Sequence, residues 1–261
     1  MNGTVKKRIV MLSPLRARGR LLLWSFLISA PWLAGGQGFL PDGGEYSPSG
    51  PANYDQVAPQ AVLGASGGYV FWQDGGIDGH QFGIAGCRLD ENLSVSYDTF
   101  RVNQKAGGSQ ERPRAALLKG GRTAVVWQGG TNGYQSIYLR LLGADGTFVN
   151  ATDIRVNNYT SNQQSAPVIA ALNTGNAVVA WSSQNQDGSQ EGVYARIVKP
   201  DGTFPTNAFR VNQTTRFNQK SPAVATLTNG NFVVVWVAEN QGLSLVQLAD
   251  MGVPGRVDIY G

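Results

Sequence analysis

The sequence predicts an all-β protein, organised as a β-propeller-like array of about four four-stranded antiparallel repeats. Tryptophans recur at intervals of 54 or 55 residues, each at the end of a short apolar run. In every copy a glutamine stands three residues before a proline, and Arg-Val-Asn closes three of the copies. A fixed period of this length indicates one supersecondary unit copied in tandem, with each copy burying its apolar face on its neighbours. The repeat markers are Trp72, Trp127, Trp181 and Trp236, together with Gln56, Gln110, Gln164 and Gln219.

The repeats occupy residues 53–261 and divide into units of about 53–106, 107–160, 161–215 and 216–261. Within a unit, runs rich in β-branched and aromatic residues alternate with turn-forming residues, as expected of short strands joined by tight turns. The pair Asp201-Gly202 is a turn that commonly joins hairpin strands. The third unit is the clearest, and its predicted strands are 167–172, 177–181, 192–198 and 208–211.

The other units follow the same order. The predicted strands are 60–63, 68–72, 82–89 and 99–102 in the first unit, 113–118, 123–127, 136–142 and 153–156 in the second, and 223–227, 232–237 and 243–248 in the fourth, which has a shortened ending. No stretch longer than a turn has the 3.6-residue period of a helix. Four-stranded units of about 40 to 55 residues are typical of β-propeller blades. The sequence leaves open whether four blades close into a ring or belong to a larger one.

The segment before the repeats predicts export. Residues 1–36 combine a basic start, the apolar run 21–30 and small residues at 34–36, as in a secretory signal peptide. The apolar run is shorter than the roughly 20 residues of a membrane-spanning helix, so we expect no stable span in the mature chain. Residues 37–52 are rich in Gly, Pro and Ser and predict a linker.

The charge distribution argues against a nucleic-acid partner. Six of the 21 Lys and Arg residues precede residue 21, so the remaining chain has 15 basic and 17 acidic residues. Because the mature body is mildly acidic, no basic surface for nucleic acid is expected from its net charge.

Single residues exclude some chemistries. Cys87 is the only cysteine, which excludes an intrachain disulfide. Its repeat equivalents are Leu139 and Ala195, so we expect Cys87 to be a small buried apolar residue. His80 is the only histidine, so we expect neither a His-based triad nor a metal site with several histidines.

The repeat resembles a unit found in tandem in large secreted and cell-surface bacterial proteins. Its pattern is Gln-x-x-Pro, then Val-Val-x-Trp, then Asp-Gly and Val-Asn, and residues 219–236 match it most closely. Residues 193–196, Asp201-Gly202 and 209–212 complete the unit. The resemblance implies an extracellular propeller-like module, often part of a longer adhesive or calcium-associated chain. It provides no catalytic residues to transfer to this sequence.

The loop that follows each tryptophan varies most between copies and is the predicted place for ligand contacts. Variable loops on a repeated scaffold commonly carry binding specificity. Asp and Asn side chains spaced by two residues near a glycine also offer oxygens to Ca²⁺, which takes six to eight of them, although no loop has three carboxylates. The candidate binding residues are Asp74, Asp78, Asn132, Tyr134, Asn185, Asp187 and Asn240. Apart from Ca²⁺, no cofactor is expected.

These features predict a secreted or cell-surface module, with the periplasm as the alternative location. We expect it to bind an extracellular glycan or protein or to act as a structural spacer, and we expect no catalysis. The alternative reading is an extracellular propeller hydrolase or a calcium-associated adhesin fragment. A propeller glycosidase needs a pair of carboxylates, whereas acidic residues are spread thinly along this sequence. An oligomer is expected if the four blades do not close.

Overall fold

The structure is a computed structural model that describes residues 47–49, 53–95, 99–239 and 257–260. The chain divides into two units, residues 1–51 and 52–261, and every strand lies in the second. The predicted signal peptide lies outside the described residues, as does most of the predicted linker. Within the described part of the chain, no helix is long and apolar enough to cross a membrane.

Residues 52–261 form four small antiparallel sheets, one for each repeat, which confirms the predicted all-β, propeller-like fold. Each sheet is called a blade below, and consecutive strands are neighbours within it. Blade 1 contains β1 (Gln56–Gly64), β2 (Gly67–Asp74), β3 (Gly83–Leu89) and β4 (Phe100–Arg101). Blade 2 contains β5 (Ser109–Leu117), β6 (Thr123–Gly130), β7 (Ser136–Leu142) and β8 (Ile154–Arg155), with a single 3-10 turn at Lys119–Gly121. Blade 3 contains β9 (Gln164–Ala171), β10 (Ala177–Gln184), β11 (Glu191–Val198) and β12 (Phe209–Arg210).

Blade 4 has three strands among the described residues: β13 (Asn218–Thr226), β14 (Phe232–Glu239) and β15 (Val257–Tyr260). The sequence predicts a third strand at 243–248, which lies outside the described residues. On the other side of β14 from β13, the segment from Trp236 to Glu239 pairs with β15.

The repeated tryptophan and glutamine form a hydrogen-bonded pair. In blade 3 the indole Nε1–H of Trp181 donates to Gln164 Oε1 over 3.0 Å, and Gln164 Nε2 donates to the Ser161 carbonyl. Both side chains are fully buried, so the pair satisfies two polar groups that would otherwise be costly to desolvate. Blades 2 and 4 repeat this arrangement with Trp127 and Gln110, and with Trp236 and Gln219.

A second repeated contact joins each blade to the next. The residue before the marker proline adopts a positive φ of 51–54° in all four blades, where the first strand carries a β-bulge. At the three blade junctions the N–H of this residue donates to the side chain that follows the tryptophan of the preceding blade. The pairs are Arg112 with Gln73 (3.3 Å), Ala166 with Gln128 (2.8 Å) and Ser221 with Ser182 (3.0 Å). This contact is called the junction hydrogen bond below.

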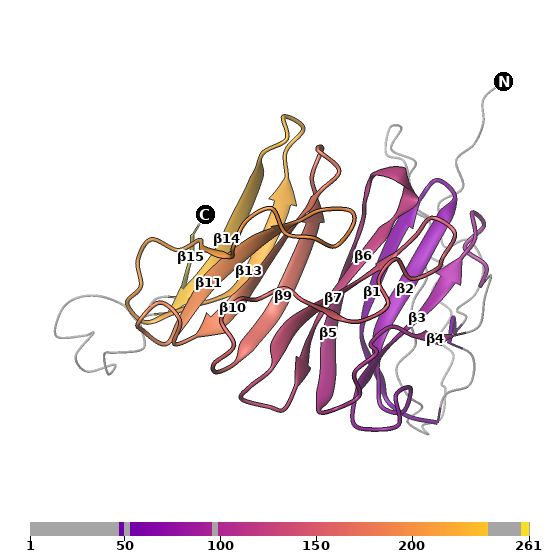
Figure 1. The fold of residues 1–261 in the computed structure, drawn as a ribbon, viewed down its shortest axis with the longest axis horizontal. Helices are drawn as coiled ribbons and strands as arrows, with labels where there is room; N and C mark the ends of the chain where they lie inside the picture. Colours follow the sequence, from indigo (N-terminus) through magenta and orange to yellow (C-terminus); the bar gives the residue numbers. More distant parts are fainter. Residues whose placement is uncertain (1–46, 50–52, 96–98, 240–256, 261) are drawn as a thin grey trace, which may run out of the picture. The chain divides into compact units, whose positions relative to one another are not determined.

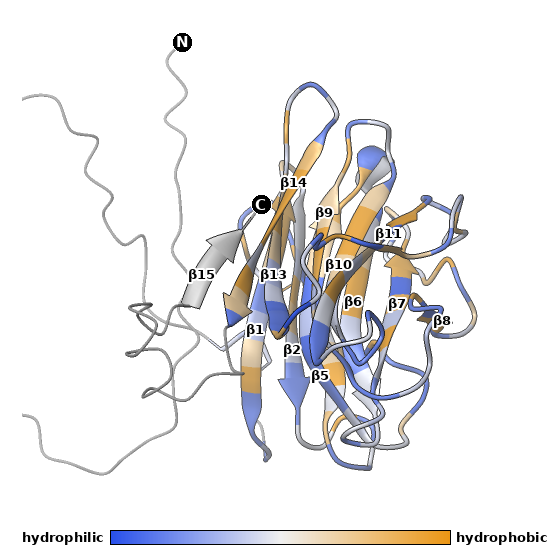
Figure 2. Cartoon of the chain, turned by 90° about the vertical axis from the view of Figure 1, so that its left-hand side faces the viewer, coloured by the Kyte–Doolittle hydropathy of each residue, from blue (hydrophilic) through white to orange (hydrophobic). Residues whose placement is uncertain are grey.

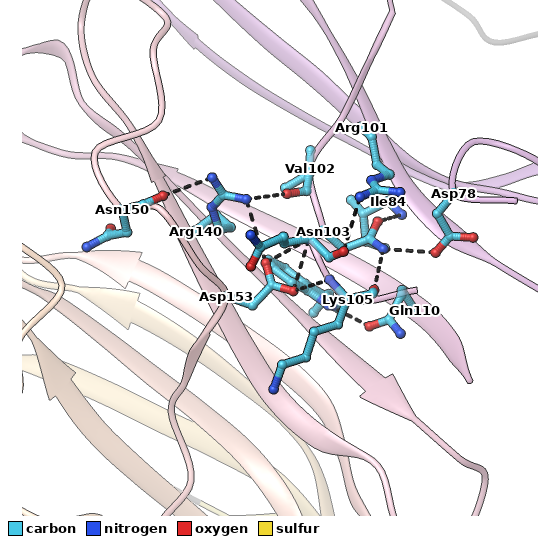
Figure 3. A network of polar contacts seen from close by, with 12 residues as sticks. Asp78, Ile84, Arg101, Val102, Asn103, Lys105, Gln110, Arg140, Asn150 and Asp153 are labelled. Carbon is cyan, nitrogen blue, oxygen red and sulfur yellow. Dashed lines mark hydrogen bonds and ion pairs between the residues drawn. The ribbon is translucent and has the colours of Figure 1, made fainter. Parts of the chain in front are cut away.

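The Asn of each Arg-Val-Asn ties the end of one blade to its third strand, as Figure 3 shows at the junction of blades 1 and 2. Asn103 Oδ1 accepts from the Ile84 N–H over 2.7 Å, and its Nδ2 donates to the Lys105 carbonyl. Arg140 of blade 2 reaches back to the Val102 carbonyl over 3.2 Å. The same asparagine bonds recur at Asn157 and Asn212.

Apolar clusters fill the spaces between blades. Hydrophobic residues run along the second strands β6 and β10, while the connecting loops are mostly hydrophilic (Figure 2). Trp127 belongs to the cluster between blades 1 and 2, and Trp181 belongs to the cluster between blades 2 and 3. Val178 and Val234 belong to the cluster between blades 3 and 4.

Within the described residues the four blades form an open series. The first strands β1, β5, β9 and β13 pack in chain order, and β13 makes no comparable contact with β1 (Figure 1). Apolar side chains are exposed at both ends, on β1 at Val57 and Leu63 and on blade 4 at Leu227 and Val233. The four blades therefore do not close into a ring by themselves. The expected oligomer stays a prediction.

Candidate active site

The loops that follow the tryptophans lie at one edge of each sheet, called the loop edge below. At this edge each second strand ends, each third strand begins, and each first strand begins, because consecutive strands are antiparallel. The predicted binding residues with described positions all lie on this edge. Asn240 lies outside the described residues.

Asp74 is buried and holds its own loop in place. Its Oδ1 accepts from the N–H groups of Gly76 and Ile77, both at 2.9 Å. Its Oδ2 accepts from the Trp72 indole at 3.0 Å and from Gln56 at 3.2 Å. Asp74 thus replaces the glutamine oxygen that receives the indole in the other blades. With four protein donors around it, this carboxylate is already satisfied without a ligand.

Asp78 and Asp187 occupy equivalent places and have equivalent structural contacts. Asp78 Oδ2 accepts from Asn103 Nδ2 over 2.9 Å, and Asp187 Oδ2 accepts from Asn212 Nδ2 over 3.1 Å. Their other oxygens accept backbone N–H groups within the same loops. These contacts brace the loops against the repeated asparagines.

The remaining predicted residues are exposed, and the structure does not gather them into one site. Asn132 and Tyr134 share the blade 2 loop, whereas Asn185 lies in the blade 3 loop with a φ of 60°. Among the described residues, no group of three His, Cys, Asp or Glu side chains could hold a metal ion. The predicted Ca²⁺ contact therefore receives no support from the loop geometry.

The loop edge brings together charged groups that the sequence analysis did not single out. Glu191 begins β11 and lies opposite Gln184 across the hairpin, while Glu239 ends β14 in the next blade. Lys220 Nζ contacts Glu239 Oε1 over 2.7 Å, and Asn218 Nδ2 lies 3.4 Å from Glu239 Oε2. Two carboxylates from different blades and one lysine thus share the junction of blades 3 and 4.

The two carboxylates differ in electrostatic environment. Burial raises the pKa of Glu191 above its ordinary value, Lys220 opposes that rise, and the charge of Glu239 adds to it. Glu239 instead has its own ion pair with Lys220. Two carboxyl groups in unlike environments, one with a raised pKa and one paired with a lysine, can divide acid and base roles between them. We call Glu191, Glu239 and Lys220 the carboxylate pair and its lysine.

A positional signal for this pair exists in the repeat. Glu239 stands three residues after Trp236, and Glu191 lies across the hairpin from Gln184, which stands three residues after Trp181. When the repeats are aligned on their tryptophans, these two positions place both glutamates on the loop edge. The sequence distance of 48 residues hides their proximity, because it is nearly one full repeat.

The fold thus belongs to the propeller-like class, with paired acidic groups at its loop edge. Comparison with solved structures finds the same fold in an α-L-arabinanase from Penicillium chrysogenum, solved with arabinobiose, at a TM-score of 0.51 and 15% identity. It also finds an α-L-arabinofuranosidase from Fusarium graminearum, solved with an iminosugar inhibitor, at a TM-score of 0.50 and 15% identity. The alignments cover 83% and 76% of this chain.

The chain spans less than two thirds of these structures, 60% of the arabinanase and 56% of the arabinofuranosidase. No protein-family model and no curated protein matches the sequence. At this identity the likeness establishes the fold.

These comparisons overturn the prediction of a non-catalytic binding module or spacer and the prediction that the protein is no enzyme. The physical reason is that acidic residues spread thinly along the sequence can still meet in the fold. A blade repeat places residues about one period apart at the same edge, so a carboxylate pair can be assembled across two blades without any local motif.

Proposed function

We propose that the protein is a carbohydrate-active propeller that hydrolyses a glycosidic bond with Glu191 and Glu239 of the loop edge. The observation that carries the proposal is the carboxylate pair, in which burial favours the protonated form of Glu191 while Lys220 pairs with Glu239. The fold shared with the arabinanase and the arabinofuranosidase supports a glycan as the substrate class.

The roles follow from the two environments. Glu191 donates its proton to the glycosidic oxygen as the bond to the leaving sugar breaks, which is the general-acid step of a glycosidase. Glu239 is the partner carboxylate. It either takes a proton from the water molecule that attacks the anomeric carbon or attacks that carbon itself. Lys220 pairs with Glu239 and stabilises the charge of its carboxylate. The anomeric configuration of the released sugar, compared with that of the substrate, distinguishes the two routes. Inversion indicates attack by water, and retention indicates direct attack by Glu239.

The test is release of reducing sugar from arabino-oligosaccharides by the full chain. Glu191→Gln and Glu239→Gln should each lower kcat by about 100-fold or more, because general acid–base catalysis contributes on that scale. The matched control is Glu91→Gln, which makes the same chemical change in an exposed turn of blade 1. Equal activity of the two loop-edge variants and the control would contradict the assignment.

The pH profile gives a second readout. Activity should fall with rising pH as Glu191 loses its proton, because burial raises the pKa of this general acid above its ordinary value. Substitution of Glu191 should remove the fall at higher pH.

We also propose that the enzyme acts outside the cytoplasm, because residues 1–36 are a predicted signal peptide.

A further inference from the structure

An open pocket of about 390 Å³ lies at the loop edge where blades 1 and 2 meet. It is separate from the carboxylate pair, which lies at the junction of blades 3 and 4. Residues that precede β1, follow β2 and precede β3 line it, together with the first residue of β5. They are Tyr54, Asp55, Gly75, His80, Gln81, Phe82 and Ser109.

Tyr54 is an aromatic side chain held in place with an uncovered ring. It is 64% exposed, although the chain beneath it is constrained. The Gly75 N–H donates to the Asp55 carbonyl over 3.0 Å, which ties the segment before β1 to the loop after β2. A Cβ on Gly76 would lie 2.2 Å from a carbon of the Tyr54 ring. The ring therefore rests on glycine backbone that leaves no room for a side chain.

Polar groups surround this ring. Ser109 Oγ donates to Gln81 Oε1 over 2.7 Å, which fixes the amide that borders the pocket. His80 is exposed, and its backbone N–H donates to Asp78 Oδ1, so the braced loop holds the backbone of His80 at the rim of the pocket. The pocket lining thus offers a hydroxyl, an amide, an imidazole and one carboxylate around an aromatic face.

We propose that this pocket binds a neutral sugar residue stacked on Tyr54. An aromatic ring presents an apolar face to the C–H side of a sugar, while the surrounding polar groups match its hydroxyls. No Lys or Arg lines the pocket, which disfavours a phosphate or another anion as the ligand. The inference rests on the proposed function, because it assigns a binding place for the glycan at a distance from the carboxylate pair.

The experiment measures binding of arabinobiose, xylobiose and cellobiose by calorimetry. It uses the full chain carrying Glu191→Gln, so that turnover does not consume the probe. At least one probe should bind, with Kd on the order of 1 mM or tighter. Tyr54→Ala should weaken that binding at least tenfold. The control is Phe209→Ala, which removes an exposed aromatic side chain from β12 of blade 3, outside the pocket, and should leave Kd unchanged.

A second variant separates the binding role from a folding role. Gly76→Ala keeps Tyr54 but places a methyl group against its ring, so it should weaken binding while the far-UV spectrum and melting temperature stay near those of the parent. The proposal is overturned if none of the three probes binds, or if Tyr54→Ala binds as tightly as Phe209→Ala. Hydrolysis is measured separately on the parent chain. If the probes bind but the parent chain does not hydrolyse them, the result contradicts the carboxylate assignment and leaves the sugar-binding proposal standing.

Discussion

At the scale of single residues, the buried indole–amide pair shows why glutamine recurs with tryptophan. Gln164 accepts from Trp181 and donates to the Ser161 carbonyl, so one side chain satisfies a buried donor and a buried acceptor at once. Blade 1 solves the same problem with a carboxylate, because Asp74 stands beside Trp72 and receives its indole. The fold therefore requires an acceptor for the indole N–H, which is an amide in three blades and a carboxylate in blade 1.

Replacing Gln164 by Leu should lower the free energy of unfolding by about 1–3 kcal/mol, because the indole N–H and the carbonyl lose their partner in the core. Urea denaturation followed by tryptophan fluorescence measures this change. Gln104→Leu is the control, since Gln104 is exposed and its side chain should matter little. Equal stability of the two variants would show that the pair contributes nothing to folding.

Glu191 should make stability depend on pH. Its pKa is raised in the folded state, so the folded protein binds more protons than the unfolded chain between the ordinary glutamate pKa and the raised one. Stability from this group should thus fall as pH increases through that window, and it should be unaffected below it. Glu191→Gln should remove the fall, as measured by thermal melts from pH 3 to pH 8. A parent and variant with parallel stability profiles would contradict the raised pKa.

Cys87 should be unreactive while the protein is folded. Its side chain is fully buried in the apolar cluster of blade 1, and burial raises the pKa of its thiol to about 11. Because the thiolate is the reactive form, an aromatic disulfide reagent at pH 8 should label the native chain very slowly. The same reagent in denaturant should label the single thiol at once. Fast labelling of the native protein would mean that blade 1 opens readily.

At the scale of the elements, the junction hydrogen bond connects a β-bulge to the neighbouring blade. The bulge turns the N–H of Ala166 out of its own sheet, and Gln128 of blade 2 accepts it over 2.8 Å. The proline that follows cannot donate a hydrogen bond, so the bulge occurs where the ladder is interrupted in any case. The acceptor is absent after the last tryptophan, where the residue is Val237.

Gln128→Ala should cost about 1–3 kcal/mol of stability, because it leaves the Ala166 N–H without its acceptor at a buried junction. Gln128→Glu retains an acceptor for the Ala166 N–H, but it replaces the donor to Glu111 by a second carboxylate, so it should not restore stability where both are ionised. Hydrogen exchange of the Ala166 amide provides a local readout, and we expect it to accelerate in the Ala variant. An unchanged exchange rate would remove the junction role.

The sequence predicted the elements well, whereas the proposed site depends on packing between blades that the sequence does not express locally. Strands such as β6 and β10 are dictated by local β-branched and aromatic residues bounded by turns, and the period places them in blades. The loop carboxylates Asp78 and Asp187 look ligand-binding in sequence, yet their oxygens are used by the repeated asparagines. Glu191 and Glu239 are assembled only when two blades pack, and no local pattern expresses that packing.

At the scale of the whole array, each blade is stabilised by its neighbours, so an interior blade has two partners and an end blade one. The outer face of blade 1 is nevertheless well covered over β2 and β3. The outer face of blade 4 is the less covered end, with Val233 42% exposed although its equivalent in blade 3, Val178, is fully buried. The energetic consequences of openness should therefore be largest in blade 4.

The same substitution in two blades tests this difference. Trp181 is fully buried between blades, whereas Trp236 is half-buried, and each donates to its glutamine over 3.0 Å. Trp181→Ala should cost about 3–5 kcal/mol, and Trp236→Ala should cost about half as much, since less apolar area is lost. The hydrogen bond lost is the same in both, so the difference measures burial alone. Stability that comes from association depends on protein concentration. If the two variants are equally destabilised at high protein concentration, and a difference between them appears on dilution, a second copy covers blade 4.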